Sequence, residues 1–414
     1  MRVRSRRLST VGIAQSMIAG FLCFISVGFI RQQKHFISTI HQLSESKSLF
    51  MTFDDDSEHM LGPPLKKRKT NKVAKTTTLH SCQLYNETLT FPEVPAFIII
   101  GAQKAGSSAL ADYLKLHPNI VGPNSNREKE LHFLDWMIPK KKEARDEKQH
   151  EMNISTEEEL WCYYRQNYAN NFDTELLRRN ASLLAFEKTP SYMIHGYYLP
   201  EVLKKVCPWN PKLLAILRNP IDRAWSQYNM AKSVGQVFSQ SDQKAIGKNN
   251  PTTFEELLEK EVASLNLLRL SDAPPLSDNE WDRSKFAVLP NITASELDAA
   301  HKKHFRQIFL SNYLQRGMYA IHLQRWKEAF GDNLLVIRYE DLYGPNAQDF
   351  YDQVVDHIGV ARVPLPILEG KHWSRQKYRL KLSNRTREYL GLFFQPYNDM
   401  LAGLLNEKWE NSWT

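Results

Sequence analysis

The stretch that decides the fold is Phe97-Ile98-Ile99-Ile100-Gly101-Ala102-Gln103-Lys104-Ala105-Gly106-Ser107-Ser108-Ala109-Leu110. Its apolar, β-branched beginning is closed by a glycine, which predicts a buried strand. The leucines and alanines at positions 109–116 then predict a helix. A strand, a glycine-rich loop and a helix form a unit in which the loop amides and the helix N-terminus bind an anion, best of all a phosphate.

The spacing within this loop separates it from the loop of nucleotide triphosphatases. Their pattern, G-x-x-x-x-G-K-[ST], has a lysine directly after the second glycine. Here Gly101 and Gly106 keep the spacing, but Ser107 takes the place of the lysine and Lys104 lies inside the loop. We expect Lys104 to reach the group held by the loop amides, and Ser107 and Ser108 to begin the helix with hydroxyls available.

The composition permits one large domain or two small ones and favours an acidic partner. The chain has 414 residues, 42% hydrophobic content and a formal net charge of +8. Nucleic acid, anionic lipid and acidic polysaccharide all fit such a charge.

An uncharged apolar segment spans residues 11–30, about the length needed to cross a bilayer. Four arginines precede it, so the positive-inside rule predicts a cytoplasmic tail at 1–10 and a lumenal location for the rest. We expect a type II signal anchor; a cleaved signal peptide is the alternative that Ala19 and Gly20 leave open. The lumenal location is supported by five glycosylation sequons, which begin at Asn86, Asn153, Asn180, Asn291 and Asn384.

Residues 31–92 lack sustained periodicity and are rich in Ser, Lys, Thr and Asp. This predicts a stem or linker that precedes a folded domain at 93–414. A basic run at 63–69 is similar to a nuclear import signal, but in a lumenal stem it would be a solvated stretch.

Beyond the apolar segment the chain has three cysteines, Cys82, Cys162 and Cys207. They allow one disulfide, and we favour Cys162 with Cys207 because both fall in the predicted folded part. Their spacing does not suggest a metal site.

Four apolar runs organise the predicted domain. Besides the run in the opening stretch they lie at 183–186, 212–217 and 334–337, with helical patterns between them. This alternation predicts a mainly parallel sheet with helices on both faces. We expect 233–300 to form an insertion or lid with one amphipathic helix at 254–268, and 382–409 to serve packing.

Charged residues follow these runs at the carboxyl ends of predicted parallel strands, where open α/β sheets bind ligands. Lys188 follows the second run. Arg218 ends the third, and Ser226 lies two turns into the next helix, so both can face one phosphate; for Arg218 alone a surface salt bridge is the alternative. Glu130 lies among apolar and aromatic residues, as a carboxyl with a shifted pKa would, unless its segment is a surface turn that covers the core.

Together these motifs resemble the Golgi carbohydrate sulfotransferases, most nearly the glycosaminoglycan branch that includes heparan sulfate 3-O-sulfotransferases and the sulfotransferase half of the N-deacetylase/sulfotransferases. The resemblance covers residues 94–410 in blocks: the loop 101–108, Glu-x-His-Phe at 130–133, Glu187-Lys-Thr-Pro, Leu217-Arg-Asn-Pro with Ser226, and Phe393-Phe-x-Pro-x-Asn. It implies an α/β fold with a P-loop-like parallel sheet flanked by helices, an N-terminal transmembrane helix with a stem, and a location in the Golgi membrane.

The resemblance also implies a donor and the residues that bind it. The family's donor is 3′-phosphoadenosine 5′-phosphosulfate (PAPS), and no metal is required. Arg218 and Ser226 would hold its 3′-phosphate. The 5′-phosphosulfate would lie on the loop residues, which are Lys104, Ala105, Gly106, Ser107 and Ser108.

Three further roles follow from the resemblance. Glu130 falls on the general base, His132 on its companion histidine, and Lys188 on a second lysine near the transferred sulfuryl group. The implied acceptor is a hydroxyl or amino group of an acidic carbohydrate, and nucleic acid is not an expected partner.

Two other functions are weighed against a sulfotransferase. A kinase or nucleotide triphosphatase is disfavoured because the lysine after Gly106 is missing and no clear metal-binding aspartate follows a later strand. A non-catalytic, membrane-anchored binder of acidic glycans or nucleotide would not need Lys104, Glu130 and Lys188, all of which are present where the chemistry requires them.

Overall fold

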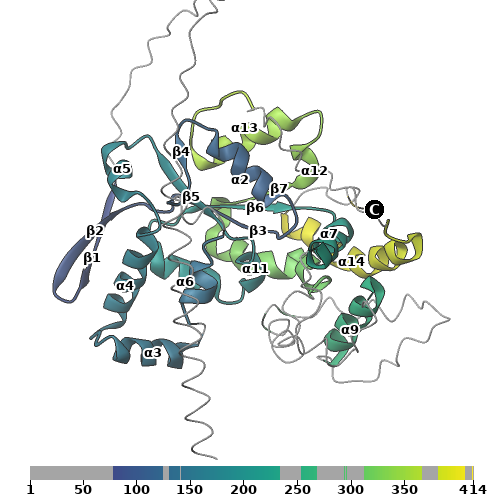
Figure 1. The fold of residues 1–414 in the computed structure, drawn as a ribbon, viewed down its shortest axis with the longest axis horizontal. Coiled ribbons are helices and arrows are strands. Elements are labelled where there is room, and N and C mark those ends of the chain that lie inside the picture. Colours follow the sequence, from purple (N-terminus) through teal and green to yellow (C-terminus); the bar gives the residue numbers. More distant parts are fainter. Residues whose placement is uncertain are drawn as a thin grey trace, which may run out of the picture. The chain divides into compact units, whose positions relative to one another are not determined.

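The structure is a computed structural model that describes residues 78–124, 130–139, 141–233, 253–267, 293, 295, 312–365, 381–405 and 413. At the centre of this part lies a five-stranded parallel sheet (Figure 1). Its strand order is β4 (Ile120–Val121), β5 (Leu184–Lys188), β3 (Phe97–Gly101), β6 (Lys212–Leu217) and β7 (Leu334–Arg338). The parallel α/β fold predicted from the four apolar runs is confirmed, with β4 as a short additional edge strand.

Successive side chains of the strands point to opposite faces of the sheet, and each face has its own helices (Figure 1). Phe97 and Ile99 pack in one cluster with α2 (Ser107–Lys115) and α13 (Ala347–Ile358). Ile98 and Ile100 pack in another with the helices of the opposite face, which are α4 (Glu157–Ala169), α6 (Leu199–Val206) and α11 (Tyr319–Phe330). Because both faces are covered, β3 is apolar at every position of its run.

A third apolar cluster joins α7 (Pro220–Ser233), α9 (Phe254–Leu267) and α14 (Asn384–Leu405). The helix predicted at 254–268 is thus confirmed, and most of the remainder of 233–300 lies outside the described residues. The carboxylate of Glu261 in α9 is buried and accepts hydrogen bonds from the amides of Leu314 and Gln315 at 3.0 and 2.8 Å. α14 contains Pro396 and buries Phe393 and Phe394, as expected for a packing element.

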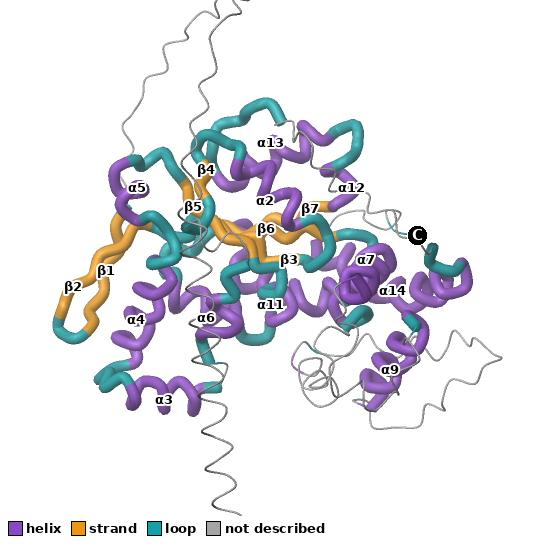
Figure 2. Tube along the Cα trace, viewed as in Figure 1, coloured by secondary structure: helices purple, strands orange, loops and turns teal. Residues whose placement is uncertain are grey.

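The described residues also form α3 (Lys142–Glu151), α5 (Thr174–Arg179), α12 (Tyr339–Leu342) and a π-helical turn, η2 (Phe133–Met137). Three short 3-10 helices are η3 (Met193–His195), η5 (Gln315–Gly317) and η6 (Gly331–Asn333). In the sequence, α3, α4 and α5 (purple in Figure 2) lie between β4 and β5, within the helical pattern predicted between the first two apolar runs. α4 begins with a capping box, in which Thr156 and Glu159 satisfy each other's backbone amides.

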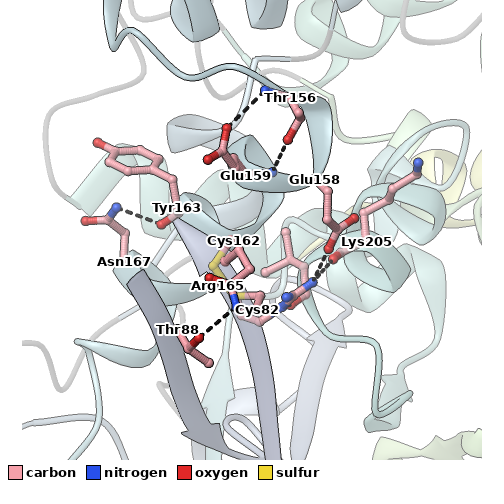
Figure 3. Close-up of a disulfide and its surroundings, with 12 residues drawn as sticks. Cys82, Thr88, Thr156, Glu158, Glu159, Cys162, Tyr163, Arg165, Asn167 and Lys205 are labelled. Carbon is pink, nitrogen blue, oxygen red and sulfur yellow. Dashed lines mark hydrogen bonds and ion pairs between the residues drawn. A yellow bond between two sulfur atoms is a disulfide. The ribbon is translucent and has the colours of Figure 1, made fainter. Parts of the chain in front are cut away.

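An antiparallel hairpin, β1 (Leu79–Leu84) and β2 (Glu87–Pro92), precedes the sheet. Its range falls within the expected stem at 31–92, so a strand pair is present where the sequence predicted a linker. The hairpin is joined to α4 by a disulfide between Cys82 and Cys162, whose Cα atoms are 5.8 Å apart (Figure 3). The expected pairing of Cys162 with Cys207 is therefore wrong, because Cys162 faces β1, whereas Cys207 is buried as a free thiol at the end of α6.

Within the described ranges, no helix is both long and apolar enough to cross a membrane. The expected anchor at 11–30 and residues 31–77 of the expected stem lie outside those ranges.

Candidate active site

The carboxyl ends of the parallel strands meet at one edge of the sheet and bring residues from distant parts of the chain together. The loop with Lys104 follows β3, Lys188 is the last residue of β5, and Arg218 directly follows β6. Tyr339 directly follows β7. All four strand ends therefore contribute to a single site.

Gly106 shapes the loop after β3. It has a φ of +96°, and a Cβ atom there would come within 2.6 Å of Cδ2 of Tyr339. This glycine caps α2, so the first-turn amides of Ser107 and Ser108 have no intrahelical acceptor and carry the positive end of the helix dipole. Ala105 supports the turn from inside, since its side chain is buried and its amide donates to the carbonyl of Ala102 at 3.1 Å.

A cavity of about 270 Å³ opens at this edge. It is lined by most of the residues expected at the site, namely Lys104, Gly106, Ser107, Ser108, Glu130, Arg218 and Ser226. Ala105, His132 and Lys188 are not among its lining residues. The side chain of Ala105 is buried within the loop, and the side chains of His132 and Lys188 contact the carboxylate of Glu130.

The cavity is rich in positive charge. Burial, and next the charge of Arg218, lower the pKa of Lys104 despite the opposing charge of Glu130. The Arg218 guanidinium lies over the ring of Tyr339, 4.7 Å from its centroid. A bound anion would relieve the repulsion between Lys104 and Arg218, so the site favours negatively charged ligands.

Lys188 contacts two residues that line the cavity because of its register in β5. It continues the face of Phe186, which packs on the α2 side of the sheet. Its Nζ atom donates to Oγ of Ser108 at 3.1 Å and to Oε1 of Glu130 at 3.3 Å. Lys188 thereby links the first turn of α2 to the carboxylate of Glu130.

The second oxygen of Glu130 faces an imidazole. Oε2 of Glu130 is 3.3 Å from Nε2 of His132, whose Nδ1 is 3.1 Å from Oδ2 of Asp135. Asp135 also accepts a hydrogen bond from Oγ of Ser191 at 2.6 Å. The result is a chain of polar groups that runs from Ser191 through Asp135 and His132 to Glu130.

This arrangement changes the pKa values of Glu130 and His132 in the directions that favour the charged form of each. Burial opposes the charge on each, but the hydrogen bonds and charges of Asp135 and Glu130 outweigh it and raise the pKa of His132 to about 9. Burial likewise opposes the charge of Glu130, yet the contacts with His132 and Lys188 lower its pKa. Glu130 is therefore an ionised carboxylate at neutral pH.

Hydrogen bonds below the cavity hold the segment that contains His132 and Leu134 against the residues that follow β5. The amide of Leu134 donates to the hydroxyl of Tyr192 at 3.1 Å, and the amide of His132 donates to Oγ1 of Thr189 at 3.3 Å. Thr189 in turn donates to the fully buried carboxyl of Glu187, which also accepts a hydrogen bond from Tyr168. Burial raises the pKa of Glu187 to about 7.

The sequence analysis missed several residues that the structure brings to the site. Asp135 and Ser191 orient His132, and Tyr339 and Tyr343 line the cavity. The contact between His132 and Asp135 could have been inferred from the sequence, because the two residues are three positions apart. The tyrosines could be found from their place after a strand, where Tyr339 follows β7 as Arg218 follows β6.

In the part of the chain that the structure describes, no group of three or more His, Cys, Asp or Glu side chains is arranged to hold a metal ion. The fold and the site define an α/β protein with a parallel central sheet flanked by helices and a cavity in which Lys104 and Arg218 lie beside the carboxylate of Glu130.

Comparison with known families identifies this class more closely. The sulfotransferase domain family matches residues 95–360, which include every strand of the central sheet, and the chain belongs to this family. The resemblance noted from the sequence motifs is thereby confirmed.

Curated relatives include heparan sulfate enzymes. The bifunctional heparan sulfate N-deacetylase/N-sulfotransferase 1 of Caenorhabditis briggsae is 27% identical over 240 residues, which cover 57% of this chain and 19% of that protein. Human heparan sulfate glucosamine 3-O-sulfotransferase 6 is 27% identical over 136 residues, 32% of this chain and 30% of that protein. The chain thus spans less than a third of the length of these relatives.

A membrane-associated sulfotransferase of Dictyostelium discoideum, kil1, is 26% identical over 141 residues, which cover 33% of this chain and 23% of that protein. Among solved structures, a sulfotransferase from Alicyclobacillus acidocaldarius aligns with a TM-score of 0.46 and 20% identity, covering 76% of this chain and 96% of that one.

Proposed function

We propose that the chain is an enzyme that transfers the sulfuryl group of PAPS to a hydroxyl or amino group of a carbohydrate, a glycosaminoglycan-like polysaccharide. The observation that carries this proposal is the convergence of Lys104, Arg218 and the N-terminus of α2 on a cavity that Glu130 also borders. Membership of the sulfotransferase family supports the donor, and the heparan sulfate enzymes among the relatives support the class of acceptor.

The cavity has separate groups for the two anionic ends of the donor. Lys104 with the first-turn amides of Ser107 and Ser108 suits the 5′-phosphosulfate. Arg218 and the buried Ser226 come from β6 and α7, beside the loop, and suit the 3′-phosphate. PAPS supplies an activated sulfuryl group whose leaving group is a phosphate.

Glu130 would act as the general base. As the acceptor oxygen or nitrogen forms a bond to sulfur, its proton passes to the Glu130 carboxylate, and the bond from sulfur to the bridging phosphate oxygen breaks to release 3′-phosphoadenosine 5′-phosphate (PAP). Negative charge grows on that oxygen, which Lys104 and the loop amides stabilise. Lys188 would orient Glu130 and place a positive charge near the transferred sulfuryl group, because it contacts both Glu130 and the loop residue Ser108.

A Golgi membrane location with the domain in the lumen belongs to the same proposal. The apolar segment at 11–30 would be a type II anchor, and residues up to the hairpin a stem. Two features of the described structure support a lumenal domain. A disulfide joins Cys82 and Cys162, as an oxidising compartment permits. The sequon asparagines in the described ranges are exposed, as glycosylation requires; they are Asn86, Asn153, Asn180 and Asn384.

The test is transfer of label from [35S]PAPS by the full-length chain to a panel of desulfated heparin, chondroitin and algal polysaccharides. We expect the wild type to label one class of polymer, and Lys104→Ala to reduce transfer by roughly 10²–10³-fold, the usual effect of removing a group that stabilises developing charge. Lys115→Ala removes an exposed lysine from the last turn of α2 and should leave transfer unchanged. A wild-type chain that neither binds PAP nor transfers label would overturn the proposal.

A further inference from the structure

An exposed aromatic side chain lies next to the proposed general base. The π-helical turn η2 divides its apolar residues between inside and outside: Phe133 and Leu134 are buried, whereas Trp136 and Met137 keep 65% and 64% of their surface exposed. Large apolar side chains that stay exposed beside a polar site commonly mark a surface that binds a ligand.

Trp136 is held in a fixed orientation by the catalytic segment itself. Its indole stacks on the imidazole of His132 with ring centroids 3.7 Å apart and an interplanar angle of 7°. The edge of the same imidazole faces Glu130 and Asp135. One face of the indole is thereby covered by His132, and the exposure of the side chain leaves the other face to solvent.

This geometry suits a particular kind of ligand. Pyranose rings present a face of C–H groups, which packs on the electron-rich face of an aromatic ring. Sugar sites combine such an aromatic surface with a few polar groups that fix orientation, and here Glu130 lies just across the imidazole. The indole carries no charge, so its contribution does not depend on carboxylate or sulfate groups of the polymer.

We propose that Trp136, together with Met137, forms a stacking platform that binds a pyranose ring of the acceptor and so presents its hydroxyl or amino group to Glu130. The inference rests on the proposed function, since it names a binding site for the acceptor of that reaction. Donor binding does not involve the platform, because Trp136 is not among the residues that line the donor cavity.

The experiment compares Trp136→Ala and Trp136→Phe with the wild-type full-length chain, on the polymer that the wild type labels best. Loss of one aromatic stacking contact is worth roughly tenfold in affinity. We expect Trp136→Ala to raise the KM for the polymer about tenfold while the KM for PAPS stays unchanged, and Trp136→Phe to keep most of the affinity. Equilibrium binding of the polymer to the PAP-saturated chain should weaken in parallel. Tyr85→Ala, which removes a 52% exposed aromatic residue at the β1–β2 turn, is the matched control.

Varying the salt concentration distinguishes the contribution of stacking on Trp136 from that of ion pairs with the polymer. Raising the ionic strength screens charge contacts but not stacking, so the ratio of KM values between Trp136→Ala and the wild type should stay constant. An unchanged KM for the polymer in Trp136→Ala would overturn the inference. A fall in kcat with an altered pH profile but the same KM would do so too, because Trp136 would then only position His132.

The outcome also distinguishes this inference from the proposed function. If the wild type transfers label and Trp136→Ala behaves like it, only the platform is refuted. If the wild type binds PAP but labels no pyranose polymer, the platform is refuted and donor binding stands. If the wild type does not bind PAP, the proposed function itself fails.

Discussion

At the scale of single residues, His132 carries the most informative electrostatics of the site. Its two ring nitrogens face the carboxylates of Glu130 and Asp135, and its side chain is only 17% exposed. Burial lowers the pKa of the imidazole, but the two carboxylates outweigh this effect and raise the pKa to about 9. A protonated His132 keeps Glu130 ionised and therefore ready to accept a proton.

The raised pKa of His132 predicts how its contribution to stability depends on pH. A group whose pKa is higher in the folded state stabilises the fold fully below its unfolded value, near 6.5, and loses that contribution as the pH rises through its folded value, about 9. The loss of unfolding free energy in His132→Gln should thus be largest below pH 6.5 and shrink toward pH 9. Chemical denaturation across this pH range measures it.

His150→Gln is the control for that experiment, because it replaces an exposed histidine on α3. A destabilisation by His132→Gln that is the same at every pH would contradict the assignment of a charged imidazole between Glu130 and Asp135.

At the scale of elements, the hairpin of β1 and β2 depends on a long-range covalent link. The disulfide between Cys82 and Cys162 closes a loop with a sequence separation of 80 residues. Loops of this length lose substantial entropy in the unfolded chain when they are cross-linked.

We predict that the double variant Cys82→Ser/Cys162→Ser loses about 4.5 kcal/mol of unfolding free energy, from the loop-entropy relation. Equilibrium unfolding in denaturant measures the loss. Reducing agent should lower the stability of the wild type by a similar amount and have no effect on the double variant. A wild-type unfolding midpoint that is insensitive to reducing agent would show that this link does not stabilise the fold.

Four strands of the central sheet could be predicted from apolar runs, which are continuous in β3 and β6 because these two strands are buried on both faces. The two-residue strand β4 is too short to give such a signal. The hairpin could not be recognised by the same signal, since β1 buries only Cys82 and Leu84, and β2 buries only Phe91 and Pro92 at its end. Its missed prediction explains the wrong disulfide, because without β1 there was no partner for Cys162 on that side of α4. The available signal was Asn86, a residue type that tolerates the positive φ that Tyr85 and Asn86 adopt in the turn.

At the scale of the whole molecule, the site exists because parallel strands deliver their carboxyl ends to one edge. Residues on those ends, such as Lys104, Lys188 and Arg218, could be placed from the sequence for that reason. Ser191 could not, because its contact with His132 joins residues that are 59 positions apart in the sequence. For Asp135 the three-residue spacing from His132 was the only sequence signal, and the stacking of Trp136 on His132 comes from the π-helical turn. The sequence thus predicted the residues at the strand ends better than those that surround His132.

The central claim, that Glu130 takes the proton of the acceptor in a cavity that holds the sulfuryl donor, is tested most directly by single-turnover transfer from [35S]PAPS. We predict that Glu130→Gln slows transfer by roughly 10²–10⁴-fold, the usual contribution of a general base, without weakening PAP binding. Glu147→Gln, which neutralises an exposed carboxylate on α3, should transfer at the wild-type rate. Transfer by Glu130→Gln at the wild-type rate would contradict the account.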